Sequence, residues 1–345
     1  MRNRRLVGEK ITLEYGAGGN AMRALIEQVF AAGFGGVEGG IGLPEMDDGA
    51  AIPIGHGRWL VITTDSHVVQ PIVFPGGDIG RLAVCGTVND LAMMGATEPL
   101  ALTCAAILED GFPRAELEKI WGSIRTACNE AGTSIVTGDT KVMRRGELDR
   151  IALTTTGVAI ASRIVPDRGL VPGDVMIVTG TVGDHGLAIL ATRAELALDT
   201  QLASDVAPIN ALVRAALEAG GDGIVAMKDP TRGGLASALH EMADKSGVGI
   251  VLHERRVPVR DEARAVGELL GIDPLLVANE GKAVIGVRRE AAERVLEALR
   301  AHPLGKNAAL VGECVTERPD SVIVDTGFGR RLLNEAEGEL QPRIC

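Results

Sequence analysis

The stretch from Trp59 to Met94 decides the fold. It opens with Trp59-Leu-Val-Ile-Thr-Thr-Asp65, turns at Pro75-Gly-Gly77, and ends in Leu82-Ala-Val-Cys-Gly-Thr-Val-Asn-Asp-Leu-Ala-Met-Met94. The first run predicts a buried strand that ends at an acid, and the last predicts an apolar helix from about Asp78 to Met94. A buried strand followed by an apolar helix is the repeating unit of an α/β protein.

The same alternation continues on both sides of this stretch. No fixed-period repeat interrupts it, which excludes solenoids and propellers. We therefore predict the α/β class, of α+β type. Further strands are predicted at 11–15, 100–108, 134–137, 151–161, 175–179, 248–253 and 283–287. Further helices are predicted at 21–32, 114–131, 186–193, 207–219 and 290–301. The segment 226–234 is predicted to open one more helix, which runs to about 245.

A break falls at Arg163-Ile-Val-Pro-Asp-Arg-Gly-Leu-Val-Pro-Gly173, where prolines and glycines cluster. We place a domain boundary there. The predicted organisation is an N-terminal α/β domain over 1–165, a C-terminal α/β domain over 166–333 and a flexible polar tail over 334–345.

The chain is acidic, with 46 Asp+Glu against 35 Lys+Arg and a formal net charge of −11 over 345 residues. This balance argues against binding nucleic acid or an anionic membrane through bulk charge. No apolar run of about 18 residues and no signal-like apolar region is found, so we expect a cytoplasmic protein.

The five cysteines are widely spaced, without a C-x-x-C pair. A disulfide framework or zinc knuckle is therefore not favoured. Four lie in apolar or mixed segments typical of buried small side chains, whereas Cys345 is the last residue and follows a polar stretch.

A glycine-rich loop, Gly16-x-Gly18-x-x-Ala21, resembles the dinucleotide fingerprint. A nicotinamide site is not favoured, because the following segment 31–37 is mostly glycine and does not form the second strand that a Rossmann unit needs. Backbone N–H groups of such a loop can still cradle phosphate. The Walker A pattern is absent, so ATP would have to bind without a P-loop.

Acids stand at strand ends, in loops and inside the apolar helix. Carboxylates in such places are typical Mg²⁺ ligands, with phosphate oxygens completing the shell. Each could also be a cap or turn residue, but an acid within an apolar helix is costly unless it is paired. The candidates are Asp48, Asp65, Asp90, Asp139 and Asp229.

Lys141, Glu280 and Lys282 lie in short polar turns and could equally be solvated. His185 has no Cys/His spacing for zinc, which leaves general acid/base work as its possible role. No G-x-S-x-G elbow of a serine hydrolase occurs.

Together these motifs resemble the HypE family of [NiFe]-hydrogenase maturation factors, within the AIR synthetase (PurM-like) superfamily. The resemblance covers almost the whole chain, and the ending Pro342-Arg-Ile-Cys345 is its most specific part. One departure is Tyr15, where the family usually has His. The motifs are Tyr15-Gly-Ala-Gly-Gly19, Thr64-Asp-Ser-His67, Phe74-Pro-Gly-Gly-Asp-Ile-Gly80, Cys85-Gly-Thr-Val-Asn-Asp-Leu91, Gly138-Asp-Thr-Lys-Val142, Gly183-Asp-His-Gly186, Asp229-Pro-Thr-Arg-Gly-Gly234 and Asn279-Glu-Gly-Lys282.

The resemblance implies two PurM-like domains, a homodimer formed through the N-terminal domains, and an ATP-dependent carbamoyl dehydratase. It implies that Cys345 receives a carbamoyl group from HypF. ATP then activates the carboxamide oxygen, loss of phosphate leaves a thiocyanate, and the HypC–HypD complex accepts the cyanide.

The resemblance also implies residue roles. Asp48, Asp65, Asp90 and Asp229 would bind Mg²⁺ and triphosphate, and Glu280 would abstract a proton. Lys141 would meet the phosphate or the carboxamide. The implied ATP-binding set is Gly16, Gly18, Gly19, Asn89, Asp139, Thr140 and Lys141.

The segment 333–345 spans at most about 43 Å when extended, at roughly 3.3 Å per residue, enough to visit two active sites. We expect it to lie outward without nucleotide and inward with it. Two alternatives remain open: a phosphotransferase acting on a free small molecule, as in selenophosphate synthetase, and a non-catalytic scaffold whose tail only docks a partner.

Overall fold

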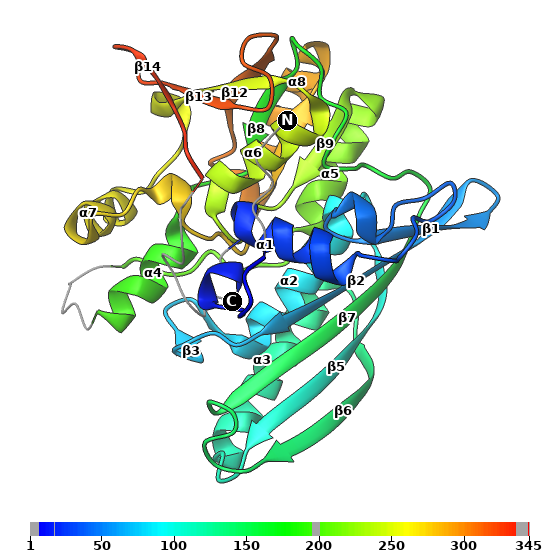
Figure 1. Cartoon of the computed structure of the whole chain (residues 1–345), viewed down its shortest axis with the longest axis vertical. Helices are drawn as coiled ribbons and strands as arrows, with labels where there is room; N and C mark the ends of the chain where they lie inside the picture. The colour runs from blue at the N-terminus through cyan, green and yellow to red at the C-terminus, as the bar shows by residue number, and fades with distance from the viewer. Residues whose placement is uncertain (1–6, 17, 195–200, 336–343, 345) are drawn as a thin grey trace.

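The computed structural model describes residues 7–16, 18–194, 201–335 and 344. Two mixed sheets, each accompanied by helices, form the two halves of the molecule (Figure 1). The predicted α/β class is confirmed.

The first sheet has five strands in the order β1-β2-β7-β5-β6, all antiparallel except the β5–β6 pair. Burial alternates along β7, which gives the sheet one face on the helices and one more open face. The edge strand β6 is mostly exposed. The elements of this half are β1 (Ala50–Gly55), β2 (Arg58–His67), β3 (Val73–Phe74), β4 (Gly77–Asp78), β5 (Pro99–Glu109), β6 (Ile135–Met143), β7 (Ile151–Ala161), α1 (Gly19–Leu25), α2 (Ile79–Met93) and α3 (Arg114–Ala131).

Helix α2 lies between the two halves. Asp78 caps its start by accepting hydrogen bonds from the backbone N–H of Gly80 and Arg81, both at 2.9 Å. Almost all of its residues are buried, as an all-round apolar helix requires. One end packs into the core of the first sheet, while Ala92 and Met93 belong to a cluster with α5 residues such as Leu212.

The second sheet has seven strands in the order β14-β13-β10-β12-β8-β11-β9. Strands β8 and β11 are buried along their whole length, because helices cover both faces of the sheet centre. The elements of this half are β8 (Val175–Val178), β9 (Ile224–Lys228), β10 (Gly249–His253), β11 (Val284–Val287), β12 (Ala309–Val315), β13 (Val322–Asp325), β14 (Arg330–Leu332), α4 (Asp184–Arg193), α5 (Asn210–Gly220), α6 (Gly234–Ser246), α7 (Asp261–Leu270) and α8 (Ala292–Ala301).

Three local predictions were wrong. The predicted strand 11–15 is a 3-10 turn, Leu13–Gly16, in which the buried Tyr15 hydroxyl accepts from the backbone N–H of Gly8 at 2.8 Å. The predicted helix 21–32 ends its α-helical part at Leu25 and continues as a π-helix, Ile26–Phe30. The segment 226–234 does not open a helix: β9 runs to Lys228, and α6 starts only after Pro230 and the left-handed Gly233.

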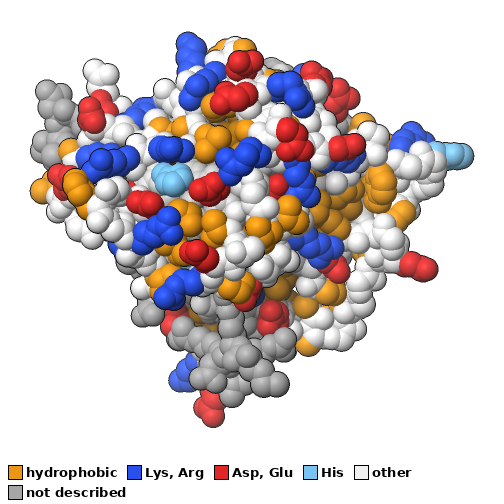
Figure 2. All heavy atoms as spheres, turned by 90° about the horizontal axis from the view of Figure 1, so that it is seen from above, with side chains coloured by type: hydrophobic (Ala, Val, Ile, Leu, Met, Phe, Trp, Pro, Cys, Tyr) orange, Lys and Arg blue, Asp and Glu red, His pale blue; other side chains and the backbone are white. Residues whose placement is uncertain are grey.

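The face shown in Figure 2 carries acidic and basic side chains interspersed, so it offers no continuous basic patch of the kind that binds nucleic acid. Among the described residues, none of the helices has the length and apolar content needed to cross a bilayer.

Candidate active site

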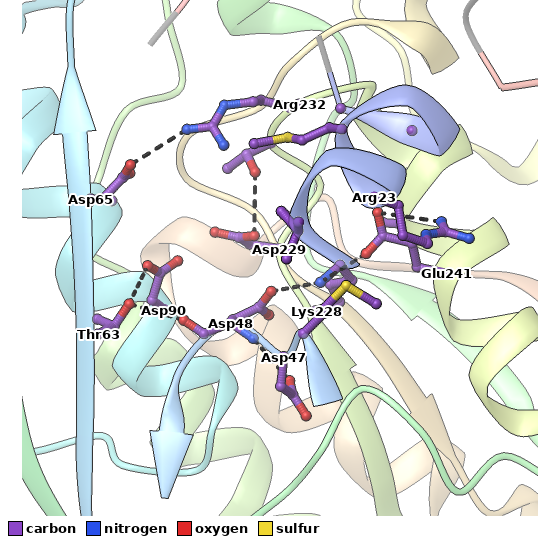
Figure 3. A pocket seen from close by; sticks show the side chains of 18 of the residues that line it. Arg23, Asp47, Asp48, Thr63, Asp65, Asp90, Lys228, Asp229, Arg232 and Glu241 are labelled. Carbon is purple, nitrogen blue, oxygen red and sulfur yellow. Dashed lines mark hydrogen bonds and ion pairs between the residues drawn. The ribbon is translucent and has the colours of Figure 1, made fainter. Parts of the chain in front are cut away.

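A deep polar pocket lies between the two halves (Figure 3). Its lining comes from α1, the loop before β1, strand β2, helix α2, the end of β9, the loop after β9 and helix α6. The polar residues that line it are Arg23, Asp47, Asp48, Thr63, Thr64, Asp65, Asp90, Lys228, Asp229, Thr231, Arg232, Glu241, Lys245 and Glu280.

Strand β2 and helix α2 set one wall. The Thr63 hydroxyl donates to Asp90 Oδ2 at 2.9 Å and also lies 3.0 Å from the Asp48 carbonyl oxygen. Asp65 extends from the same strand, where its Oδ1 accepts from the Ser66 backbone N–H at 2.8 Å. These contacts bring the predicted residues Asp48, Asp65 and Asp90 to one wall of the pocket.

Lys228, the last residue of β9, also lines the pocket. Its Nζ lies 2.6 Å from Asp48 Oδ1, 3.2 Å from Glu241 Oε2 and 3.4 Å from Asp167 Oδ2. Burial lowers the pKa of this ammonium, but the three carboxylates outweigh it and raise the pKa well above the usual value. Lys228 is therefore a fixed positive charge in the pocket wall.

Asp229 follows Lys228 directly. In Figure 3 its carboxylate points into the same space as those of Asp48 and Asp90. Burial and the charge of Asp48 raise the pKa of Asp229 to about 8. Burial, reinforced by Asp229, Asp65 and Asp48, raises the pKa of Asp90 well above its usual value. These carboxylates destabilise one another when no cation lies between them.

Asp65 behaves in the opposite way. Burial raises its pKa, but His67 and Arg232 outweigh that effect and hold it well below the usual value. His67 Nε2 lies 3.2 Å from Asp65 Oδ2, and Arg232 Nη2 lies 3.4 Å from Asp65 Oδ1. Asp65 is therefore ionised at neutral pH and can bind a cation.

The donor set fits a divalent cation. Seven carboxylates line the pocket against four basic side chains. Asp48 Oδ2 and Glu280 Oε1 are buried without a hydrogen-bond partner. Within the described ranges no group of three or more His, Cys, Asp and Glu side chains is already assembled around one point for a metal. Mg²⁺ does not need such a group, since it takes one or two carboxylates together with phosphate oxygens and water.

Glu280 lines the pocket from the loop before β11. Its side chain is buried, and its backbone N–H donates to Asp205 Oδ1 at 3.1 Å. Burial, followed by the charges of Asp229 and Asp65, raises its pKa well above the usual value. A carboxyl group with a raised pKa is suited to accept and release a proton near neutral pH.

Several of the other predicted site residues do not line the pocket. Gly18 and Gly19 do, but Gly16 does not. Asn89 is buried, and its amide donates to the carbonyls of Ala207 and Glu280, both at 3.1 Å, while its oxygen accepts from the Ile209 backbone N–H at 2.9 Å. Within this chain Asn89 therefore positions the backbone around Glu280.

Asp139, Thr140 and Lys141 lie within β6 and not in the predicted turn. Lys141 Nζ pairs with Asp139 Oδ2 at 3.2 Å, and both side chains are largely exposed at 69% and 63%. They line no part of the pocket of their own chain. Cys345 lies outside the described residues.

Sequence reasoning missed the basic residues Arg23, Lys228, Arg232 and Lys245. A signal was available for Lys228, because a lysine in the apolar strand Ile224-Val-Ala-Met-Lys228 must be paired if it is buried. Arg232 stands in the motif Asp229-Pro-Thr-Arg-Gly-Gly234, but nothing in that motif alone indicates its contact with Asp65.

Family models match both halves of the chain: AIR synthase related protein, N-terminal domain, over 46–161, and AIR synthase related protein, C-terminal domain, over 171–325. The carbamoyl dehydratase HypE of Cupriavidus necator is 45% identical, covering 97% of this chain and 95% of its own length.

Solved structures agree. The chain matches one from a crystal structure of a HypE–HypF complex with a TM-score of 0.84 and 43% identity, covering 91% of this chain and all of that one. It matches a hydrogenase maturation protein HypE in complex with ATP with a TM-score of 0.80 and 39% identity, covering 97% of this chain and all of that one. The pocket of converging carboxylates thus belongs to a known fold, and the chain is a member of the HypE family of AIR synthase-related proteins.

Proposed function

We propose that this protein is an ATP-dependent carbamoyl dehydratase of hydrogenase maturation, which converts an S-carbamoyl group on its own Cys345 into a thiocyanate. The observation that carries this proposal is the pocket of buried carboxylates, Glu280 among them, in a chain that matches HypE proteins over nearly its whole length. The same pocket suits the small-molecule phosphotransferase chemically, but the family matches do not favour that alternative.

The proposed reaction has two steps, phosphorylation of the carboxamide oxygen and loss of phosphate. The carboxamide oxygen attacks the γ-phosphorus of ATP and ADP leaves, while a base takes one N–H proton. The C–O bond then breaks, inorganic phosphate leaves with the second N–H proton, and the carbon–nitrogen triple bond forms. Phosphorylation is needed because an unactivated carboxamide oxygen is a poor leaving group.

Asp48, Asp65, Asp90 and Asp229 are the residues that would hold Mg²⁺, which neutralises phosphate charge when it is bound. The cation would also relieve the repulsion among these carboxylates. Lys228 fixes Asp48, and Arg232 fixes Asp65, so the ligands keep their orientation.

Glu280 is the proposed base. Burial, followed by neighbouring carboxylates, raises the pKa of Glu280, and positive charge in the pocket would lower that pKa again. Asn89 and Asp205 hold the backbone on which Glu280 stands, so the carboxylate can receive an N–H proton without a large movement of the loop.

A second copy of the chain would explain Lys141. The edge strand β6 exposes Val136 and Val142 at 63% and 67%, together with the backbone edge beside them. A homodimer that covers this region can bring Asp139, Thr140 and Lys141 to the pocket of the other copy. The roles proposed for these three residues therefore depend on the dimer.

We further propose HypF as the carbamoyl donor and the HypC–HypD complex as the cyanide acceptor, with the chain acting in the cytoplasm. The solved complex of a related HypE with HypF supports the first of these. The division into domains over 1–165 and 166–333, with a tail over 334–345 that delivers Cys345, is part of the same proposal.

The test is mass spectrometry of the C-terminal peptide after incubation with HypF, carbamoyl phosphate, ATP and Mg²⁺. A carbamoyl adduct should form on Cys345 and then lose one water. Glu280→Gln should accumulate the carbamoyl adduct, and Cys345→Ala should show neither mass. A carbamoyl adduct that never loses water in the unaltered protein would overturn the proposal. Persistent ATP turnover on a small substrate by Cys345→Ala would favour the phosphotransferase.

A further inference from the structure

A histidine at the start of α4 contacts the described part of the chain's C-terminal end. His185 is fully buried, and its Nε2 lies 2.9 Å from the backbone carbonyl oxygen of Ile344, 159 positions away. Its Nδ1 lies 2.7 Å from Ser204 Oγ. Ile344 itself is 6% exposed. None of these residues lines the carboxylate pocket.

The contacts of His185 specify one protonation state. A carbonyl oxygen can only accept, so His185 Nε2 must carry the proton and donate it to Ile344. Burial lowers the pKa of His185 and favours the neutral ring, which leaves Nδ1 as an acceptor. The Ser204 hydroxyl can donate to Nδ1 while its oxygen accepts from the Val206 backbone N–H at 3.1 Å. Both ring nitrogens of His185 and the Ser204 hydroxyl therefore have hydrogen-bond partners while Ile344 is in place.

The side chain of Ile344 is also held. It belongs to one buried cluster with Phe74, Ile189, Val206 and Ala278. The Phe74 ring meets the His185 ring edge-on, with centroids 5.5 Å apart and planes at 89°. An apolar side chain and a backbone carbonyl are thus recognised side by side.

Hydrogen bonds connect the site for Ile344 to the loop that carries Glu280. The backbone N–H of Gly183 donates to Asn279 Oδ1 at 2.7 Å, and that of Gly186 donates to the Ala278 carbonyl at 3.0 Å. Asp205, next to Ser204, accepts from the Glu280 backbone N–H. The segments that carry His185 and Ser204 are therefore both hydrogen-bonded to the loop that carries the proposed base.

The base of the tail is held in a similar way. His240 Nε2, on α6, lies 2.6 Å from the Leu333 carbonyl oxygen, and Leu333 is buried. Imidazoles thus contact backbone carbonyls at both described ends of the last segment.

We propose that His185 and Ser204 form a positioning site for the penultimate residue, Ile344, and that occupation of this site presents the modified Cys345 to the pocket for dehydration. The proposal rests on the proposed function. His185 is a positioning residue, because it acts through the chain end. When the tail leaves to receive its carbamoyl group, the buried Nε2–H loses its acceptor, so the site favours the docked state.

Thiol alkylation measures docking without any enzyme activity. Cys85, Cys104, Cys128 and Cys314 are buried, and burial raises their thiol pKa, so N-ethylmaleimide at neutral pH reports Cys345. His185→Leu should speed alkylation of Cys345 about tenfold, as expected for loss of one buried hydrogen bond. His185→Gln, whose amide can donate in place of Nε2–H, should return the rate to near that of the unaltered protein. His302→Leu, in a half-exposed position where the imidazole only accepts from Leu304, is the matched control and should change nothing.

Ile344→Glu keeps the test independent of folding, because the altered residue is on the tail. It should speed alkylation as His185→Leu does, and the double variant should be no faster than either single variant. Equal alkylation rates in the unaltered protein, His185→Leu and Ile344→Glu would overturn the proposal.

The rates of the two enzyme steps, dehydration and carbamoylation, give a second readout, because the variant should slow the first and not the second. His185→Leu should slow single-turnover loss of water from the carbamoyl adduct about tenfold, leave carbamoylation by HypF unchanged or faster, and leave the KM for ATP unchanged. Slowing of both steps together would indicate a folding defect and count against the proposal. If the unaltered protein never dehydrates its adduct, the proposed function fails, while the alkylation rates still decide the docking site.

Discussion

Lys228 Nζ lies 2.6 Å from Asp48 Oδ1, and this ion pair joins residues 180 positions apart across the two halves of the molecule. Lys228 also contacts Glu241 and Asp167. Asp167 has a second ammonium partner in Lys245, at 2.5 Å. The pocket is therefore a stability element as well as a site for chemistry.

Removing that ammonium should be strongly destabilising. Lys228→Met leaves buried carboxylates uncompensated, and we expect a loss of about 3–5 kcal/mol in the free energy of unfolding, measured by urea denaturation. Lys306→Met, at an exposed lysine, is the control and should change it by less than about 0.5 kcal/mol. A loss below about 1 kcal/mol for Lys228→Met would mean that the cluster reorganises around the gap.

The pocket also predicts how stability depends on pH. Burial, with the charges of Asp167 and Asp48, raises the pKa of Asp47 from 3.8 to about 7. Between these values the folded protein keeps a proton that the unfolded chain has lost, so the free energy of unfolding falls as pH rises from about 4 to about 7. Asp47→Asn should remove the Asp47 contribution to this slope in urea titrations without nucleotide, while the raised pKa values of Asp90, Asp229 and Glu280 keep the rest of it.

Asp222→Asn is the matched control, because its side chain is fully exposed. It should leave the slope unchanged. The interpretation fails if the unaltered protein becomes more stable over this pH range, or if Asp47→Asn keeps the full slope.

Mixing two inactive variants tests the shared site. Lys141→Ala and Asp65→Asn should each lose most dehydration when pure. If β6 of one copy serves the pocket of the other, mixed dimers contain one intact site, and an equal mixture should recover about a quarter of the activity. Native mass spectrometry of differently tagged copies would verify that mixed dimers form. Recovery absent from a verified mixed dimer would show that Lys141 does not serve the pocket of the other copy.

Gly86 on α2 tests how closely the pocket wall is packed. A Cβ at this position would lie 2.9 Å from His67 Nε2 and 3.2 Å from Asp65 Oδ2. Gly86→Ala should therefore displace the pair that keeps Asp65 ionised and weaken binding of Mg²⁺ and ATP at least tenfold by calorimetry. Gly122→Ala on α3, where the nearest atom is 4.0 Å away, should bind normally and gain up to about 1 kcal/mol of stability. Normal binding by Gly86→Ala would show that the wall adjusts.

Two of the candidate acids, Asp65 and Asp90, were predictable because each breaks a local rule. Asp90 is a charge in an apolar helix, and Asp65 ends an apolar strand, so both needed a polar reason to be there. The predicted bounds of β5, α3 and β7 agree closely with the observed ones, because long amphipathic or apolar segments carry a strong periodic pattern.

The positions of Asp139 and Lys141 were not predictable. Gly138-Asp139 has the composition of a turn, but Gly138 lies within β6 and pairs with Cys104 of the neighbouring strand. A Cβ at position 138 would lie 2.1 Å from the Cys104 carbonyl oxygen, so only glycine fits there. The glycine allows close backbone approach and does not mark a turn. A lysine in the apolar strand signals that Lys228 needs a partner, but only the tertiary structure shows which acids surround it.

Helix α2 has a consequence for the reaction cycle. Its residues pack into the hydrophobic clusters of both sheets, so rotating one half away from the other would expose those apolar side chains to water. Hinge opening of the pocket is therefore disfavoured at every turnover. Under the proposed function, the scaffold stays closed and the covalently attached substrate would travel on the end of the chain.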